Sequence, residues 1–140
     1  MATTPKYEKL GNAEVQIHDL GGNKELHTFE NPEKVRLYEI KLSTPELTSL
    51  CPATGHPDFC TLEIVYSPDL VCVEMKSLKL YVESFRNEGH FYEELINLIF
   101  NHLESVLDPN RLKVTGTFNV RGGMPAVVTV EDDRSFGVLL

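Results

Sequence analysis

Several features that define whole classes of protein are missing from this sequence of 140 residues. It contains no apolar run long enough to span a bilayer and no segment typical of a secretory signal. It also has no long basic run, and its formal net charge of −8 argues against a protein that coats nucleic acid. Its three cysteines are an odd number, so we expect free thiols and a soluble protein of the reducing cytoplasm.

Internal repeats, low-complexity segments and any Cys/His set at a metal-ligand spacing are absent too, so we expect no metal. What is present is ordinary globular composition, with 41% hydrophobic and 24% charged residues, which argues against wholesale disorder. The length fits one domain. We expect an N-terminal arm over residues 1–33, a domain over residues 34–131 and a C-terminal tail over residues 132–140.

The spacing of apolar residues predicts the secondary structure. Two-residue alternation is typical of half-buried strands, and a stripe at i, i+3, i+4 and i+7 is typical of helices. We expect Gly89 to end the first helix in a left-handed conformation. The predicted elements are strands over residues 33–43, 59–66, 112–120 and 126–130, and helices over residues 76–86 and 91–107. The predicted inner face of the second helix consists of Leu95, Leu98, Ile99, His102 and Val106.

This order of elements, strand–strand–helix–helix–strand–strand, favours the α+β class. It is typical of an antiparallel sheet that carries both helices on one face. The other face and the edges of such a sheet would need cover, and oligomerisation provides it for a small chain.

Residues 46–60 are predicted to form a loop that carries Cys51 and Asp58. A thiol and a carboxyl on one short loop, restricted by Pro52 and Pro57, are the parts of a nucleophile and a proton donor. Most cysteines are small apolar side chains and most such aspartates are turn residues, so the loop alone favours the ordinary interpretation.

Two further segments could hold a ligand. Lys76 and Lys79 share a helical face, and two ammonium groups beside a helix start, where Ser77 could bond a backbone N–H, suit a phosphate group. Arg121 could add a bidentate donor to that anion, although a solvated lysine face is the commoner case. At the second helix start, Glu93 could accept two N–H groups of a guanine-like edge, or could be an ordinary dipole-favoured surface residue.

Together these segments resemble the short form of the NADPH-dependent 7-cyano-7-deazaguanine reductases, the nitrile reductases of queuosine biosynthesis. The lysine-bearing segment distinguishes these reductases from relatives with the same fold. The resemblance covers about residues 46–123, and it rests on SLCPATGHPDF, EMKSLKLYVESFRNEG, FYEE, the DP after the second helix and the RGG turn.

The resemblance implies the tunnelling fold, in which subunits form a pentameric barrel, two barrels stack into a decamer, and active sites lie between subunits. It implies reduction of a deazapurine nitrile to an aminomethyl group through a thioimide on Cys51, with Asp58 as proton donor. Glu93 and Phe91 correspond to substrate-binding residues, and Tyr92 stands where the family usually has histidine. The residues implied to contact NADPH are Lys76, Ser77, Lys79 and Arg121.

Other activities remain open at this point. An amidinotransferase relative uses the same cysteine and aspartate on a nitrile in tRNA, but the lysine segment and the acidic net charge argue against it. A non-catalytic ring protein could bind a purine-like ligand in the same pocket. A metal-dependent cyclohydrolase is disfavoured because no ligand set is evident.

Overall fold

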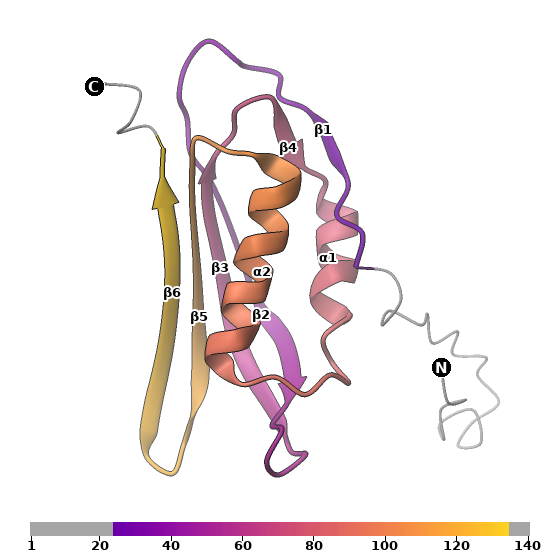
Figure 1. Ribbon diagram of the computed structural model, residues 1–140, viewed down its shortest axis with the longest axis vertical. Helices are drawn as coiled ribbons and strands as arrows, with labels where there is room; N and C mark the ends of the chain where they lie inside the picture. The colour runs from indigo at the N-terminus through magenta and orange to yellow at the C-terminus, as the bar shows by residue number, and fades with distance from the viewer. Residues whose placement is uncertain (1–23, 135–140) are drawn as a thin grey trace, which may run out of the picture.

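The computed structural model describes residues 24–134 and shows an α+β fold. Four antiparallel strands form the main sheet in the order β2-β3-β5-β6, and both helices lie on one face of it (Figure 1). Strands β1 and β4 pair as a small second sheet. The elements are β1 Thr28–Glu30, β2 Ile40–Leu50, β3 Pro57–Ser67, β4 Val71–Val73, α1 Met75–Glu83, α2 Tyr92–Leu107, β5 Arg111–Arg121 and β6 Met124–Asp133. The predicted class and the single helical face are therefore confirmed.

The predicted first strand over residues 33–43 is wrong at its start, because β2 begins only at Ile40. The preceding residues are held in a loop by the buried side chain of Asn31. Its amide donates to the carbonyl of Asp69 over 2.8 Å, and its oxygen accepts from the backbone N–H of Glu33 over 3.1 Å and from the hydroxyl of Tyr38 over 2.5 Å. These side-chain bonds compete with the pairing that a strand would need.

The predicted loop over residues 46–60 is also wrong in extent, since only residues 51–56 connect β2 to β3. Both strands extend because their residues pair in register as far as Leu50 opposite Pro57. The register shifts once between Thr44 and Leu47, around Pro45, which has no N–H for the ladder. Asp58 is consequently a residue of β3, not of a loop.

Helix α1 begins with a different cap from the one expected. The carboxylate of Glu74 accepts the backbone N–H groups of Lys76 and Ser77, over 2.5 and 2.9 Å. The hydroxyl of Ser77 instead donates to the carbonyl of Glu74 over 2.8 Å and accepts from the backbone N–H of His27 over 2.9 Å. Ser77 is therefore buried and engaged inside the chain.

The predicted left-handed end of α1 at Gly89 is wrong, because Gly89 is not among the positive-φ residues and Ser84 caps the helix. Helix α2 is followed by a left-handed residue, Asp108, with a φ of 42°. Its buried face is rotated from the predicted one, since Leu98, His102 and Val106 are only half-buried. The fully buried positions of α2 are Leu95, Ile96, Ile99, Phe100, Leu103 and Leu107.

The core lies between the helices and the inner face of the sheet. Gly116 of β5 lets α2 approach closely, because a Cβ at that position would lie 2.4 Å from Cδ1 of Ile96. Around it, Leu112, Val114 and Phe118 point inward, as their alternation predicts, whereas Val120 is exposed at the strand end. Neither described helix is long and apolar enough to cross a membrane.

Candidate active site

Three segments meet at one end of the sheet: the residue 51–56 loop, the β5–β6 turn at Gly122 and Gly123, and the start of α2 (Figure 1). Both turn glycines have positive φ, 58° and 74°, so this tight turn needs residues without a Cβ. The topology thus places residues that are far apart in sequence at one end of the molecule.

Asp58 carries a buried carboxyl at this end, with 4% of its surface exposed. The Nε of Arg121 lies 3.1 Å from its Oδ1, and the hydroxyl of Tyr92 donates to the same oxygen over 3.3 Å. Arg121 also donates to the carbonyl of Pro57. A guanidinium and a hydroxyl thus compensate the burial of this carboxylate.

The ring of Tyr92 is fixed by stacking on Phe118, with centroids 3.8 Å apart and planes 11° apart. Burial first, and then the charge of Asp58, raise the pKa of the Tyr92 hydroxyl. Tyr92 therefore keeps its proton at neutral pH and acts as a donor to Asp58.

Cys51 is half-buried on a closed loop. Its backbone N–H donates to the carbonyl of His56, and its carbonyl accepts from the N–H of Gly55, both over 2.8 Å. Hydrogen bonding from the Thr54 hydroxyl, and then from the N–H groups of Thr54 and Ala53, lowers the pKa of the Cys51 thiol against the opposing effects of burial and Asp58. A thiol with a lowered pKa and access to solvent has the properties of a nucleophile.

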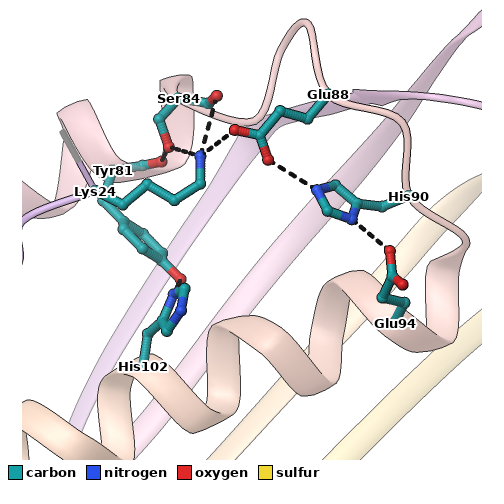
Figure 2. A network of polar contacts seen from close by, with 7 residues as sticks. All are labelled: Lys24, Tyr81, Ser84, Glu88, His90, Glu94 and His102. Carbon is teal, nitrogen blue, oxygen red and sulfur yellow. Dashed lines mark hydrogen bonds and ion pairs between the residues drawn. The ribbon is translucent and has the colours of Figure 1, made fainter. Parts of the chain in front are cut away.

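The segment before α2 holds the base of this loop. Leu50 donates its N–H to the carbonyl of Glu88 over 2.8 Å, and its carbonyl accepts from the N–H of His90 over 3.1 Å. The side chains of the same two residues then form a network (Figure 2). Glu88 contacts His90 Nε2 over 2.8 Å and Lys24 Nζ over 2.5 Å, and His90 Nδ1 lies 2.5 Å from Glu94.

This network links the residue preceding Cys51 to the first turn of α2. Burial lowers the pKa of His90, but its bonds to Glu88 and Glu94 outweigh burial and raise it overall. Burial raises the pKa of Glu88, but the hydrogen bonds from His90 and Lys24 outweigh burial and lower this pKa overall. Sequence reasoning missed this network, although the i, i+4 spacing of His90 and Glu94 was a visible signal.

Comparison with known proteins supports one family. Residues 57–135 match the family model described as QueF-like protein. The chain belongs to this family. Among its relatives, the NADPH-dependent 7-cyano-7-deazaguanine reductase of Thermomicrobium roseum is 50% identical over 81% of this chain and 88% of its own. The one of Thioalkalivibrio sulfidiphilus is 51% identical over 78% of this chain and 84% of its own. The predicted family is confirmed.

A solved structure gives the fold independently. The crystal structure of the archaeosine synthase QueF-Like in the apo form superposes with a TM-score of 0.61 at 22% identity, covering 73% of this chain and 97% of that one. At this identity the likeness concerns the fold alone. Within residues 24–134, no group of three or more His, Cys, Asp or Glu side chains could hold a metal ion.

The structure of this QueF-like protein places the other predicted residues in two separate regions. Phe91 and Glu93 are exposed at the start of α2, near Cys51. Lys76 and Lys79 are exposed on α1, which begins at the opposite end of the sheet (Figure 1). Because Arg121 is paired with Asp58, one chain does not assemble the expected cluster of Arg121 with the two lysines.

Proposed function

We propose that the protein reduces the nitrile of 7-cyano-7-deazaguanine to an aminomethyl group with NADPH, as a cytoplasmic step in queuosine tRNA modification. The observation that carries this function is the juxtaposition of Cys51, whose thiol pKa is lowered, with the buried carboxylate of Asp58. The relatives that share about half of their residues with this chain bear the name of that activity.

The first step is addition of Cys51 to the nitrile carbon. A C–S bond forms, one π bond of the nitrile opens, and its electron pair becomes a lone pair on nitrogen. The thiol proton passes to Asp58 and from there to that nitrogen, so the thioimide forms without net gain or loss of protons. Asp58 takes the proton as a carboxylate, the form that pairs with the guanidinium of Arg121.

Two reductions complete the reaction, and bound NADPH supplies a hydride for each. Between them the C–S bond breaks, and Cys51 leaves as the thiolate that its lowered pKa favours. Asp58 relays protons from solvent, first to the substrate nitrogen and finally back to the Cys51 thiolate, while the Tyr92 hydroxyl keeps its hydrogen bond to the carboxylate. Tyr92 does not itself titrate in this range, so it orients Asp58 where a histidine would also transfer protons.

Glu93 and Phe91 serve substrate recognition in this proposal. Both are exposed beside the loop of Cys51, and within the described residues no side chain pairs with the carboxylate of Glu93. A free carboxylate can accept the two N–H groups of a guanine-like edge, and an exposed aromatic ring can stack on the base.

Lys76 and Lys79 would hold the phosphates of NADPH. Both are exposed, and neither side chain forms an ion pair between residues 24 and 134, so both ammonium groups are available to an anion. Ser77 would assist from its buried place by fixing the start of α1. Because the lysines lie far from Cys51 in one chain, we propose that a neighbouring subunit supplies them.

The two edge strands of the main sheet also favour an assembly of several subunits. Strands β2 and β6 are the two edges of the main sheet, and edges of this length are normally paired or covered. Joining β2 of one subunit to β6 of the next would close a pentameric barrel, and two barrels would stack into a decamer with active sites between subunits.

The test is intact-mass measurement after mixing the protein with 7-cyano-7-deazaguanine, followed by addition of NADPH. An adduct on Cys51 that disappears as NADPH is oxidised is the expected result. An adduct that NADPH leaves unchanged would favour an amidinotransferase, and the absence of an adduct would favour a ring protein that only binds its ligand.

A further inference from the structure

Ser49 has a buried hydroxyl that makes no hydrogen bond. Its side chain is 1% exposed, and its Oγ is the buried side-chain polar atom of residues 24–134 for which no partner exists. Burial of a hydroxyl without a partner destabilises the fold, and alanine would avoid that cost at nearly the same volume. The position of this hydroxyl indicates which group could form a hydrogen bond with it.

Ser49 lies directly opposite Asp58 in the pairing of β2 with β3, and it precedes Cys51 by two residues. Side chains opposite each other in an antiparallel pair share a face, with Cβ atoms about 4.5–5.5 Å apart. Residues two apart along a strand also share a face. The side chains of Ser49 and Asp58 are therefore cross-strand neighbours on one face of the sheet, two residues before Cys51 in the chain.

The two contacts of the Asp58 side chain suit its ionised form better than its protonated form. Arg121 and the hydroxyl of Tyr92 both contact Oδ1, and both act as donors. A guanidinium can only donate, so Arg121 favours the ionised carboxylate. A serine hydroxyl can donate or accept, so Ser49 can accept a hydrogen bond from the protonated acid.

We propose that Ser49 is a positioning residue that stabilises the protonated form of Asp58 by accepting its O–H hydrogen bond. The inference rests on the proposed function, in which Asp58 takes a proton from Cys51 and passes it to the substrate nitrogen. In the ground state Arg121 and Tyr92 both contact Oδ1 of Asp58, and the hydroxyl of Ser49 has no partner. When the acid is protonated during turnover, the pairing with Arg121 weakens and the bond to Ser49 forms.

The first test needs no substrate and compares thermal unfolding of the wild type and Ser49→Ala over pH. The groups that face Asp58 are Arg121 from β5, Tyr92 from α2 and Cys51 from the loop, and all three are kept. Near pH 7 we expect Ser49→Ala to melt at the same temperature as the wild type or higher. Toward acidic pH we expect the variant to melt lower than the wild type, because only the wild type gains a bond on protonation of Asp58.

The matched control is Ser43→Ala, an exposed serine on the same strand. We expect its melting temperature to follow the wild type at every pH. An offset between Ser49→Ala and the wild type that is independent of pH would overturn the inference, whether or not the protein reacts with a nitrile.

The second test measures adduct formation with 7-cyano-7-deazaguanine over pH. We expect Ser49→Ala to react at least about tenfold more slowly, with its rate declining at a lower pH on the alkaline side, and Ser49→Thr to restore both. If Ser49→Ala forms the adduct at the wild-type rate and with the wild-type pH profile, the role of Ser49 is rejected and the proposed function is not affected. Failure of the wild type to form any adduct would reject the proposed function, and the melting comparison would still decide the role of Ser49.

Discussion

Arg121 and Asp58 connect the end of β5 to the start of β3, with Nε 3.1 Å from Oδ1. The two partners are unequal, because the side chain of Arg121 is 45% exposed whereas that of Asp58 is 4% exposed. Loss of the arginine would therefore leave a buried carboxylate without its only charged partner among the described residues.

Arg121→Gln should lower the free energy of unfolding by about 1–3 kcal/mol, because the uncompensated charge of Asp58 would remain buried. Urea unfolding at neutral pH measures this loss. Arg111→Gln is the matched control, since its bonds to Glu39 and Asp133 lie at an exposed surface and are expected to contribute less than about 1 kcal/mol. In an Asp58→Asn background the effect of Arg121→Gln should nearly vanish, and an equal loss in both backgrounds would disprove the pairing.

Cys51 should react with iodoacetamide at a lower pH than an ordinary thiol, because Thr54 and the loop N–H groups lower its pKa. Cys60 is the internal control, since burial raises the pKa of that thiol to about 12 and should keep it unmodified in the folded protein. Thr54→Val removes the hydroxyl at nearly constant volume and should move the pH midpoint of alkylation upward. Peptide mass mapping after timed alkylation gives both rates, and an unmoved midpoint in Thr54→Val would exclude Thr54 as the cause.

Tyr92→Phe should separate the two contacts of this side chain. The phenylalanine ring can keep the stacking on Phe118, whereas the hydrogen bond to Asp58 is lost. We expect a change in unfolding free energy below about 1 kcal/mol and a fall in kcat of about tenfold or more. Tyr92→Ala, which also removes the ring, should destabilise the protein more. Full activity of Tyr92→Phe would show that the hydroxyl has no part in orienting Asp58.

Replacing Lys76 and Lys79 together by alanine should raise the KM for NADPH at least about tenfold, since each charged contact to a phosphate contributes roughly 1.5–3 kcal/mol. Adduct formation on Cys51 should persist, because that step needs no NADPH. Lys41→Ala is the control, as its exposed ion pair with Glu63 lies on a different element. A KM equal to that of the wild type would remove both lysines from the cofactor site.

Elements with a strong local periodicity could be predicted from the sequence, whereas features that depend on the pairing of distant strands could not. The alternation from Leu112 to Phe118 and the helix start at Tyr92 needed only local periodicity. Strands β1 and β4 have three residues each, too few for a periodic signal. The predicted first strand ended at residue 43, because nothing local shows that a bulge around Pro45 lets the strand continue.

In the candidate site, too, single residues could be predicted from the sequence, but contacts between distant segments could not. Cys51 and Asp58 were recognisable from their residue types and from the family resemblance. The contact of Arg121 with Asp58 depends on two hairpins ending at the same level, which no local spacing encodes. Lys24 reaches Glu88 from a segment 64 residues earlier in the chain, so that ion pair was beyond prediction.

The network around His90 should make stability depend on pH in a defined window. The pKa of His90 is raised above 6.5, so its contribution is complete below that pH and is lost as pH rises through the folded value. The pKa of Glu88 is lowered below 4.5, so its contribution is complete above that pH and is lost on acidification. The network therefore stabilises the fold most between about pH 4.5 and 6.5.

His90→Gln should consequently cost more stability at pH 6 than at pH 8.5, by on the order of 1 kcal/mol. Urea unfolding of both proteins at the two pH values measures the difference. His102→Gln is the contrasting control, because burial and then Lys24 lower the pKa of His102, so the wild type should lose its advantage over that variant on acidification. Equal costs of His90→Gln at both pH values would mean that His90 is held as a neutral ring, and that its two carboxylate partners do not favour its charged form.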